Sequence, residues 1–266
     1  MTTVHTLASG SSGNALLLSC GESHLLLDAG ISCRRVTAAL RELGLEPGSL
    51  SAILITHTHA DHISGLQTLL KRCGAPLFAT ERAGRELAWR LPDAEARLEV
   101  LDFGAPRSIG DVVVTAVPTS HDAPGSCGFR LDTADGAVGV LTDTGYVTDE
   151  AADALLGVDL AVLEANHDIE TLRSGPYPYY LKQRILGPQG HLSNVDAARF
   201  AAALAESGAS EIVLAHLSRE NNTPAMAQTA VEQALSAAGV SPLLSVAPRD
   251  CPGPAHVVCR RSVCKR

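Results

Sequence analysis

The sequence lacks any apolar run long enough to cross a membrane, which takes about 18 or more consecutive apolar residues. Its first residues, "MTTVHTLASGSSGN", contain neither the basic region nor the apolar core of a secretory signal. We therefore expect a cytoplasmic protein with no membrane partner. These features predict no particular oligomeric state.

The sequence also lacks paired cysteines. Its seven cysteines are odd in number and form no CxxC motif, which argues against a disulfide framework and against a cysteine-rich zinc module. We interpret them as buried free thiols. They stand at positions 20, 33, 73, 127, 251, 259 and 264.

Positive charge is scarce, with 21 Lys and Arg against 29 Asp and Glu, a net charge of −8. This balance excludes a protein that binds nucleic acid over its whole surface, so any such binding must be confined to a patch or cleft. No low-complexity linker divides the 266 residues. We expect one α/β domain over residues 1–250, followed by a C-terminal tail over 251–266.

Short apolar runs alternate with helical patterns along most of the chain. Three runs near residues 4–8, 15–19 and 24–27 predict an antiparallel meander. Further strands are predicted at 52–55, 76–79, 112–117, 128–132, 138–142, 160–164, 211–215 and 243–246, and helices at 32–43, 62–73, 81–90, 148–156, 195–206 and 225–238. Two β-rich halves, each with helices, predict two sheets packed face to face with helices outside. This is a four-layer αββα sandwich.

The stretch "HTHADH" places three histidines and an aspartate within six residues, directly after the apolar strand "SAILI". Residues two apart on an extended segment project to the same side, so His57 and His59 can converge on one ion. Asp61 and His62 can then face a second ion. Imidazole and carboxylate suit Zn²⁺, Mn²⁺ or Fe²⁺.

More ligands follow other predicted strands. His121 comes after one strand, Asp143 after "AVGVLT" and His216 after "EIVLA". A carboxylate at Asp143 can bridge two ions. We predict a dinuclear site in which Asp143 lies between two sets of three ligands, His57, His59 and His121 on one ion and Asp61, His62 and His216 on the other.

This ordered set of residues resembles the metallo-β-lactamase-fold hydrolases over roughly residues 3–246. Within that superfamily, "LASGSSGN", "LLLDAG", "SHDA", "LTDTGY", "EANHD", "GHLSN" and "HLSRENN" resemble a YycJ/WalJ-like subgroup. The resemblance implies a dinuclear hydrolase of the metallo-β-lactamase fold, with nuclease activity that includes 5′-to-3′ exonuclease action on DNA. Only 72 residues separate Asp143 from His216, which leaves no room for the helical β-CASP insertion of larger nucleases.

Two ions can hold a bridging hydroxide as nucleophile, but the leaving alkoxide still needs a proton. His191 in "GHLSN" is our candidate general acid, oriented by Glu164, a pairing similar to that of tRNA 3′-processing endonucleases of the same superfamily. The alternative is that His191 satisfies backbone groups near the capping box at residue 193. Asp61 is counted with His191 and Glu164 among the catalytic residues.

The segment 171–190 mixes aromatic and cationic side chains, which can stack on bases and neutralise phosphates of a DNA substrate. A plain amphipathic helix is the alternative. His167 can contact phosphate or a metal ligand, or be structural, and the "GSSGN" turn can approach the site or be a simple glycine turn. The predicted substrate-binding residues are His167, Arg173, Tyr177, Tyr180, Lys182, Arg184, Ser11 and Asn14.

The sequence favours a metal-dependent phosphodiesterase acting on nucleic acid. A hydrolase of small phosphodiesters or of a thioester is a second possibility, and a non-hydrolytic metal-binding or redox module is a third. The redox version normally works beside a flavin domain, for which this chain has no room. His191 beside Glu164 also favours hydrolysis, because a redox centre has no leaving group to protonate.

Overall fold

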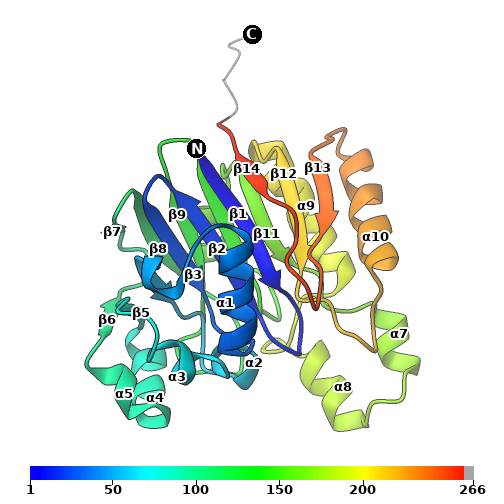
Figure 1. The fold of residues 1–266 in the computed structure, drawn as a ribbon. Helices are drawn as coiled ribbons and strands as arrows, with labels where there is room; N and C mark the ends of the chain where they lie inside the picture. Colours follow the sequence, from blue (N-terminus) through cyan, green and yellow to red (C-terminus); the bar gives the residue numbers. More distant parts are fainter. Residues whose placement is uncertain (261–266) are drawn as a thin grey trace.

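The computed structural model describes residues 1–260. Two seven-stranded sheets pack face to face, and helices cover both outer faces (Figure 1). The four-layer αββα sandwich predicted from the sequence is therefore confirmed. The N-terminus and β14 lie at the top edge in Figure 1, whereas α2, α7 and α8 lie toward the opposite edge.

The first sheet has the strand order β14-β1-β2-β3-β4-β5-β6. It is antiparallel from β14 to β3 and parallel from β3 to β6. Its strands are β1 (Thr2–Ala8), β2 (Ala15–Cys20), β3 (Ser23–Leu27), β4 (Ala52–Leu54), β5 (Leu77–Thr80), β6 (Leu98–Leu101) and β14 (His256–Val258).

The second sheet has the order β13-β12-β11-β10-β9-β8-β7. It is antiparallel from β7 to β10 and parallel from β10 to β13. Its strands are β7 (Arg107–Ile109), β8 (Val112–Pro118), β9 (Cys127–Asp132), β10 (Ala137–Leu141), β11 (Leu160–Glu164), β12 (Glu211–Ala215) and β13 (Leu243–Val246). Parallel neighbours end at one edge of the sheet, which brings the loops after β10, β11 and β12 together.

The helices are α1 (Cys33–Glu42), α2 (Ala60–Ile63), α3 (Leu66–Leu69), α4 (Glu81–Arg90), α5 (Pro92–Glu95), α6 (Asp149–Leu155), α7 (Ile169–Ser174), α8 (Tyr179–Leu186), α9 (Asn194–Ser207) and α10 (Pro224–Ala237), with a 3₁₀ turn at Pro47–Ser49. Residues of α1, α3 and α4 pack on the first sheet, and residues of α6, α9 and α10 pack on the second. Alternate residues of one strand serve different layers, because Leu16 and Leu18 face the space between the sheets while Leu17 faces the helices.

Several expectations need correction. The helix predicted over 62–73 breaks into α2 and α3 at Gly65, whose N–H donates to the Ala29 carbonyl at 2.8 Å. A Cβ at Gly65 would lie 1.9 Å from the Ile31 carbonyl oxygen, so the close packing of this loop interrupts the helix. The short strands β6, β7 and β14 were not predicted. Cys251 and Cys259 are exposed, so the interpretation of all cysteines as buried is wrong for these two.

The ordered structure continues into the segment predicted as a tail. β14 pairs antiparallel with β1, and His256 Nδ1 lies 2.6 Å from the Glu211 carboxylate of the other sheet. The rest of that segment, residues 261–266 with Cys264, lies outside the described residues. Within residues 1–260, no helix is both long and apolar enough to span a bilayer.

Candidate metal centre and catalytic pocket

The predicted metal ligands all stand in segments that directly follow strands. The HTHADH motif begins in the loop after β4 and ends in α2, which contains Asp61 and His62, and the loop after β8 carries His121. Asp143 and His216 follow β10 and β12, which belong to the parallel half of the second sheet. Four loops that are distant in sequence thus meet at one edge of the sandwich.

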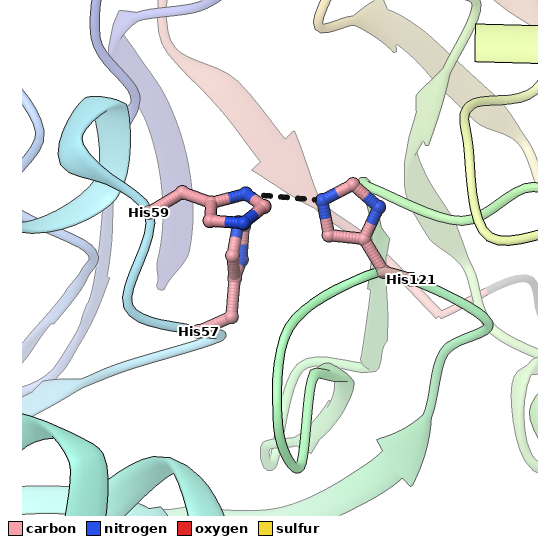
Figure 2. A group of neighbouring side chains, drawn as sticks. All are labelled: His57, His59 and His121. Atoms are coloured by element: carbon pink, nitrogen blue, oxygen red, sulfur yellow. Dashed lines mark hydrogen bonds between the residues drawn. The ribbon is translucent and has the colours of Figure 1, made fainter. Parts of the chain in front are cut away.

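The first ligand group contains His57, His59 and His121, whose candidate ligand atoms all lie within 4.8 Å of one another. Figure 2 shows the three rings turned toward one another, with His59 Nδ1 and His121 Nε2 separated by 3.2 Å. His57 and His121 are buried, whereas His59 is partly exposed. Three imidazoles at this spacing fit one transition-metal ion.

The second ligand group contains Asp61, His62 and His216. The Asp61 carboxylate lies 3.7 Å from His62 Nε2 and 3.5 Å from His216 Nε2. Both histidines are buried. Each of these two groups contains the residues of one predicted ligand set, and the two groups adjoin, since His57, His62 and Asp143 also form a compact group.

Asp143 lies between the two groups. Its Oδ1 is 3.8 Å from His121 Nε2 and 3.5 Å from His216 Nε2, and its Oδ2 is 3.3 Å from His62 Nε2. One carboxylate therefore reaches ligands of both groups. Asp143 and His216 have positive φ angles of 58° and 55°, a conformation that is uncommon outside glycine and that concentrates at functional sites.

Buried polar atoms that lack a hydrogen-bond partner test whether this centre suits metal ions. Among the described residues, His57 Nε2, Asp143 Oδ2 and His216 Nε2 are buried and have no hydrogen-bond partner. A buried polar atom without a partner costs roughly 1–3 kcal/mol. These three atoms come from both groups and from the residue between them, so the donor set fits divalent cations.

The electrostatics also favour positive charge at this centre. Burial acts to lower the pKa of His216, yet the negative charge of Asp143, with the carboxylates of Asp61 and Glu164 nearby, outweighs it and raises the pKa to about 10. Burial acts to raise the pKa of Asp143, but His216 and His62 hold it well below its usual range. The carboxylates stabilise cations here, and a bound metal ion would take the place of the imidazole proton.

Asp28 is a functional residue that we did not assign from the sequence. Its Oδ2 lies 2.8 Å from His62 Nδ1 and accepts a hydrogen bond from the Thr56 hydroxyl at 2.8 Å, while its Oδ1 accepts from the Thr56 N–H at 2.9 Å. The carboxylate thus orients His62 so that Nε2 faces the metal group. Its position directly after the apolar run "LLL" was the signal available in the sequence. In the structure Asp28 has a positive φ of 62°.

Glu164 orients two histidines at once. Its Oε1 lies 2.7 Å from His191 Nδ1 and 3.0 Å from His216 Nδ1, and its Oε2 accepts hydrogen bonds from backbone N–H groups. Burial acts to raise the pKa of Glu164, but the charge of His191 and hydrogen bonds to both histidines lower it to about 2. The ionised carboxylate holds Nδ1 of His191, so Nε2 is the nitrogen left for the substrate.

The "GSSGN" turn is built into this centre. The Asn14 N–H donates to the Asp61 carbonyl at 2.7 Å, and the Asn14 side-chain amide lies 3.0 Å from His62 Nε2. The Gly30 N–H donates to the Asn14 carbonyl at 2.8 Å. A Cβ at Gly30 would lie 1.7 Å from the Asp61 carbonyl oxygen, so only glycine allows these loops to approach.

We expect Gly30→Ala to destabilise the protein by about 1–3 kcal/mol, because the added methyl group must displace the Asp61 loop. Denaturant unfolding measures this change in the free energy of unfolding. Gly48→Ala is the matched control, since a Cβ there has no neighbour within 4 Å, and it should change stability by no more than about 0.5 kcal/mol. Equal effects of both substitutions would contradict the close-packing argument.

The centre opens into a cavity of about 250 Å³. Of the predicted substrate-binding residues, Ser11, Tyr177 and Arg184 line it. Tyr180 is 74% exposed and lies outside it, and His167 is buried away from it. Arg173 and Lys182 also lie outside, since Arg173 pairs with Glu170 and the Lys182 ammonium donates to the Arg173 carbonyl. The cavity-lining residues are Ser11, His59, Asp61, Asp143, Asn166, Tyr177, Leu181, Arg184, Ile185, His191, His216 and Ser218.

We expect metal loading to raise the melting temperature, because ions that bind only the folded centre stabilise it by mass action. Free metal at 100 times Kd contributes about 2.7 kcal/mol, and each kcal/mol raises Tm by about 2–4 °C in a protein of this size. Calorimetry before and after chelation measures this shift, with a sodium salt of equal ionic strength as control. An unchanged Tm after complete metal removal would contradict the ligand assignment.

Comparison with known proteins agrees with this geometry. A family model described as "Beta-lactamase superfamily domain" matches residues 23–217. The chain is 38% identical over 240 residues to the exodeoxyribonuclease WalJ of Streptococcus pneumoniae serotype 2, which covers 87% of each protein. It is 36% identical over 236 residues to the exodeoxyribonuclease YycJ of Bacillus anthracis, covering 88% of this chain and 89% of that protein.

Solved structures show the same fold. The metallo-β-lactamase fold protein YhfI from Bacillus subtilis superposes with a TM-score of 0.72 at 17% identity, over 96% of this chain and 100% of that chain. The short form of human tRNase Z gives a TM-score of 0.62 at 19% identity, over 96% and 100% of the two chains. The chain therefore belongs to the beta-lactamase superfamily of metallo-β-lactamase-fold proteins, in the group that contains WalJ and YycJ.

Proposed function

We propose that this chain is a metal-dependent exodeoxyribonuclease that uses two divalent ions. The observation that carries the proposal is the position of His191, which shares one cavity with ligands of both groups and is held by the buried carboxylate of Glu164 at 2.7 Å. A dinuclear centre beside an oriented proton donor suits the cleavage of an unactivated phosphodiester. The similarity to WalJ and YycJ, which are named exodeoxyribonucleases, supports DNA as the substrate.

The ligand sets proposed for the ions are His57, His59 and His121 for one, and Asp61, His62 and His216 for the other, with Asp143 shared. When bound, two such ions supply a nucleophile by lowering the pKa of a water molecule and stabilise charge on the phosphoryl oxygens. Imidazole and carboxylate ligands suit Zn²⁺, Mn²⁺ and Fe²⁺.

The protein's own groups complete the reaction. His191 Nε2 donates a proton to the departing sugar oxygen, and the Glu164 carboxylate at Nδ1 stabilises the positive charge of the ring before that transfer. Asp28 keeps His62 facing the centre throughout. The His191 side chain is 19% exposed at the cavity wall, so a substrate can reach its Nε2 atom. The same opening admits water.

The test is digestion of DNA by protein loaded separately with Zn²⁺, Mn²⁺ or Fe²⁺. Linear single-stranded DNA labelled at either end should be shortened from one end, whereas closed circular single-stranded DNA should persist. Release of the label at early times identifies the polarity, for which 5′-to-3′ is expected. Cleavage of circles at the rate of linear strands would reject exonuclease action, and cleavage of a small phosphodiester without any action on DNA would reject the polymer substrate.

A further inference from the structure

One wall of the catalytic cavity comes from a single short segment, the 177–185 wall, which consists of Tyr177 and the α8 residues Leu181, Arg184 and Ile185. None of the α8 residues is buried, and Tyr179 on its outer side is 76% exposed. The helix is therefore not part of the core. Its contribution to the molecule is the face that it turns toward the cavity.

One contact of the 177–185 wall, and two contacts of residues 188–190 directly after it, fix this segment to the loop that carries His121. Arg184 Nε donates to Asp122 Oδ2 at 2.5 Å, and the Ser120 hydroxyl donates to the Pro188 carbonyl at 2.6 Å. His121 Nδ1 lies 3.1 Å from the Gly190 carbonyl. The loop that carries a metal ligand and the segment that carries Arg184 thus hold each other in position, so Arg184 is placed relative to the metal centre in advance.

Arg184 is the one Lys or Arg among the described residues that line the cavity. Asp122 occupies its Nε, and the two terminal nitrogens of the guanidinium make no hydrogen bond within residues 1–260. The side chain is 53% exposed, so these nitrogens are accessible. A guanidinium with both terminal groups free matches two oxygens of a phosphate.

The cavity size sets how much substrate fits. Ligand cavities usually measure about 300–1,000 Å³, so a cavity of about 250 Å³ is at the small end and limits the enclosed part of a DNA strand to its terminal unit. The apolar side chains of Leu181 and Ile185 and the ring of Tyr177 can contact a nucleoside, while ligands of the metal centre and Arg184 line the same cavity. A nucleotide unit in a DNA strand carries a phosphate on each side of its sugar.

We propose that Arg184, positioned by Asp122, binds a second phosphate of the substrate, adjacent to the one that is cleaved. The 177–185 wall then holds the terminal nucleotide unit between two phosphate sites, the metal centre and the guanidinium. This inference rests on the proposed function, because it takes the substrate to be a nucleotide chain. It assigns Arg184 to substrate binding and gives no role in proton transfer to it.

The test is calorimetric titration of the metal-loaded protein with deoxythymidine 3′,5′-bisphosphate and with the two monophosphates. The parent should bind the bisphosphate about 10- to 100-fold more tightly than either monophosphate, since one charge-assisted pair contributes a factor of that size. Arg184→Ala should reduce this preference to nearly one, and Arg184→Lys should retain part of it, because a lysine keeps the charge and loses the fork.

Arg199→Ala is the matched control. Arg199 is also a surface arginine paired with a carboxylate, Asp196 at 2.9 Å, but it does not line the cavity, and its removal should leave the preference unchanged. Three results would overturn the proposal: no bisphosphate preference in the parent, an unchanged preference in Arg184→Ala, or an equal loss in Arg199→Ala.

The metal content of Arg184→Ala distinguishes a role of Arg184 in phosphate binding from a role in holding the metal-binding loop that carries His121. Arg184→Ala should retain the parent's metal content. If the variant instead loses ions, the pair with Asp122 serves only to hold the His121 loop, and the proposal fails. This test measures binding, so its outcome is independent of whether the protein digests DNA. An Arg184-dependent preference for the bisphosphate in a protein that does not digest DNA would support the phosphate site and reject exonuclease action.

Discussion

His191→Ala should lower the rate of DNA cleavage by about 10²- to 10⁴-fold, because the departing sugar oxygen would lose its proton donor. The Glu164 carboxylate at 2.7 Å engages Nδ1 of His191 and leaves Nε2 for the substrate. Single-turnover kinetics on end-labelled DNA measure the loss. Nitrophenolate needs little protonation, so cleavage of a nitrophenyl phosphodiester should fall much less.

Metal content is the decisive control for this variant. His191 Nδ1 lies 3.7 Å from Asp143 Oδ1, and the four residues Asp143, Glu164, His191 and His216 also form a compact group. If His191 is the acid, His191→Ala keeps the parent's metal content. Loss of metal, or equal rate losses on DNA and on the nitrophenyl ester, would reject the acid role. His24→Ala, far from the centre, controls for the removal of an imidazole.

The second large effect is expected for Asp143→Ala, which should lose at least one ion per chain and lower the rate by about 10²-fold or more. Asp143 contacts ligands of both groups at 3.3–3.8 Å, so removing its carboxylate weakens both. Each bound ion contributes several kcal/mol of transition-state stabilisation, and each 1.4 kcal/mol corresponds to tenfold in rate.

Elemental analysis together with the DNA assay tests this expectation. Asp153→Ala, which removes an exposed carboxylate from α6, should leave metal content and rate as in the parent. Asp143→Asn keeps the shape of the side chain and should lose less metal than Asp143→Ala. Full retention of both ions by Asp143→Ala would contradict the shared position of this residue between the two groups.

The two large effects depend on one arrangement of carboxylates around histidines. Asp28 orients His62, Glu164 orients His191 and His216, and Asp143 faces ligands of both groups. Each of these carboxylates is at most 4% exposed. A buried carboxylate is stable only beside a cation or hydrogen-bond donors, so the centre depends on protons or metal ions for its stability.

The sequence by itself determined the layered architecture and predicted the ligand residues that the fold brings together. Short continuous apolar runs predicted strands such as β11 and β12 to the residue, because strands buried on both faces are apolar along their length. The HTHADH motif predicted ligands because its four ligating side chains are so close in sequence that local geometry alone brings them together. His121, Asp143 and His216 were identifiable because each follows a predicted strand, and strand ends of one sheet meet at one edge.

Only the tertiary structure decided the features that depend on contacts between distant residues. The strands β6, β7 and β14 are short and lie at or near sheet edges, where partial exposure weakens the alternating pattern. The break at Gly65 comes from a carbonyl 34 residues earlier, at Ile31. Of the cations in the 171–190 segment, the fold places Arg184 in the cavity and leaves Arg173 and Lys182 outside it. Local spacing fixes which way a side chain points from its own strand or helix, whereas the packing of whole elements decides what it meets there.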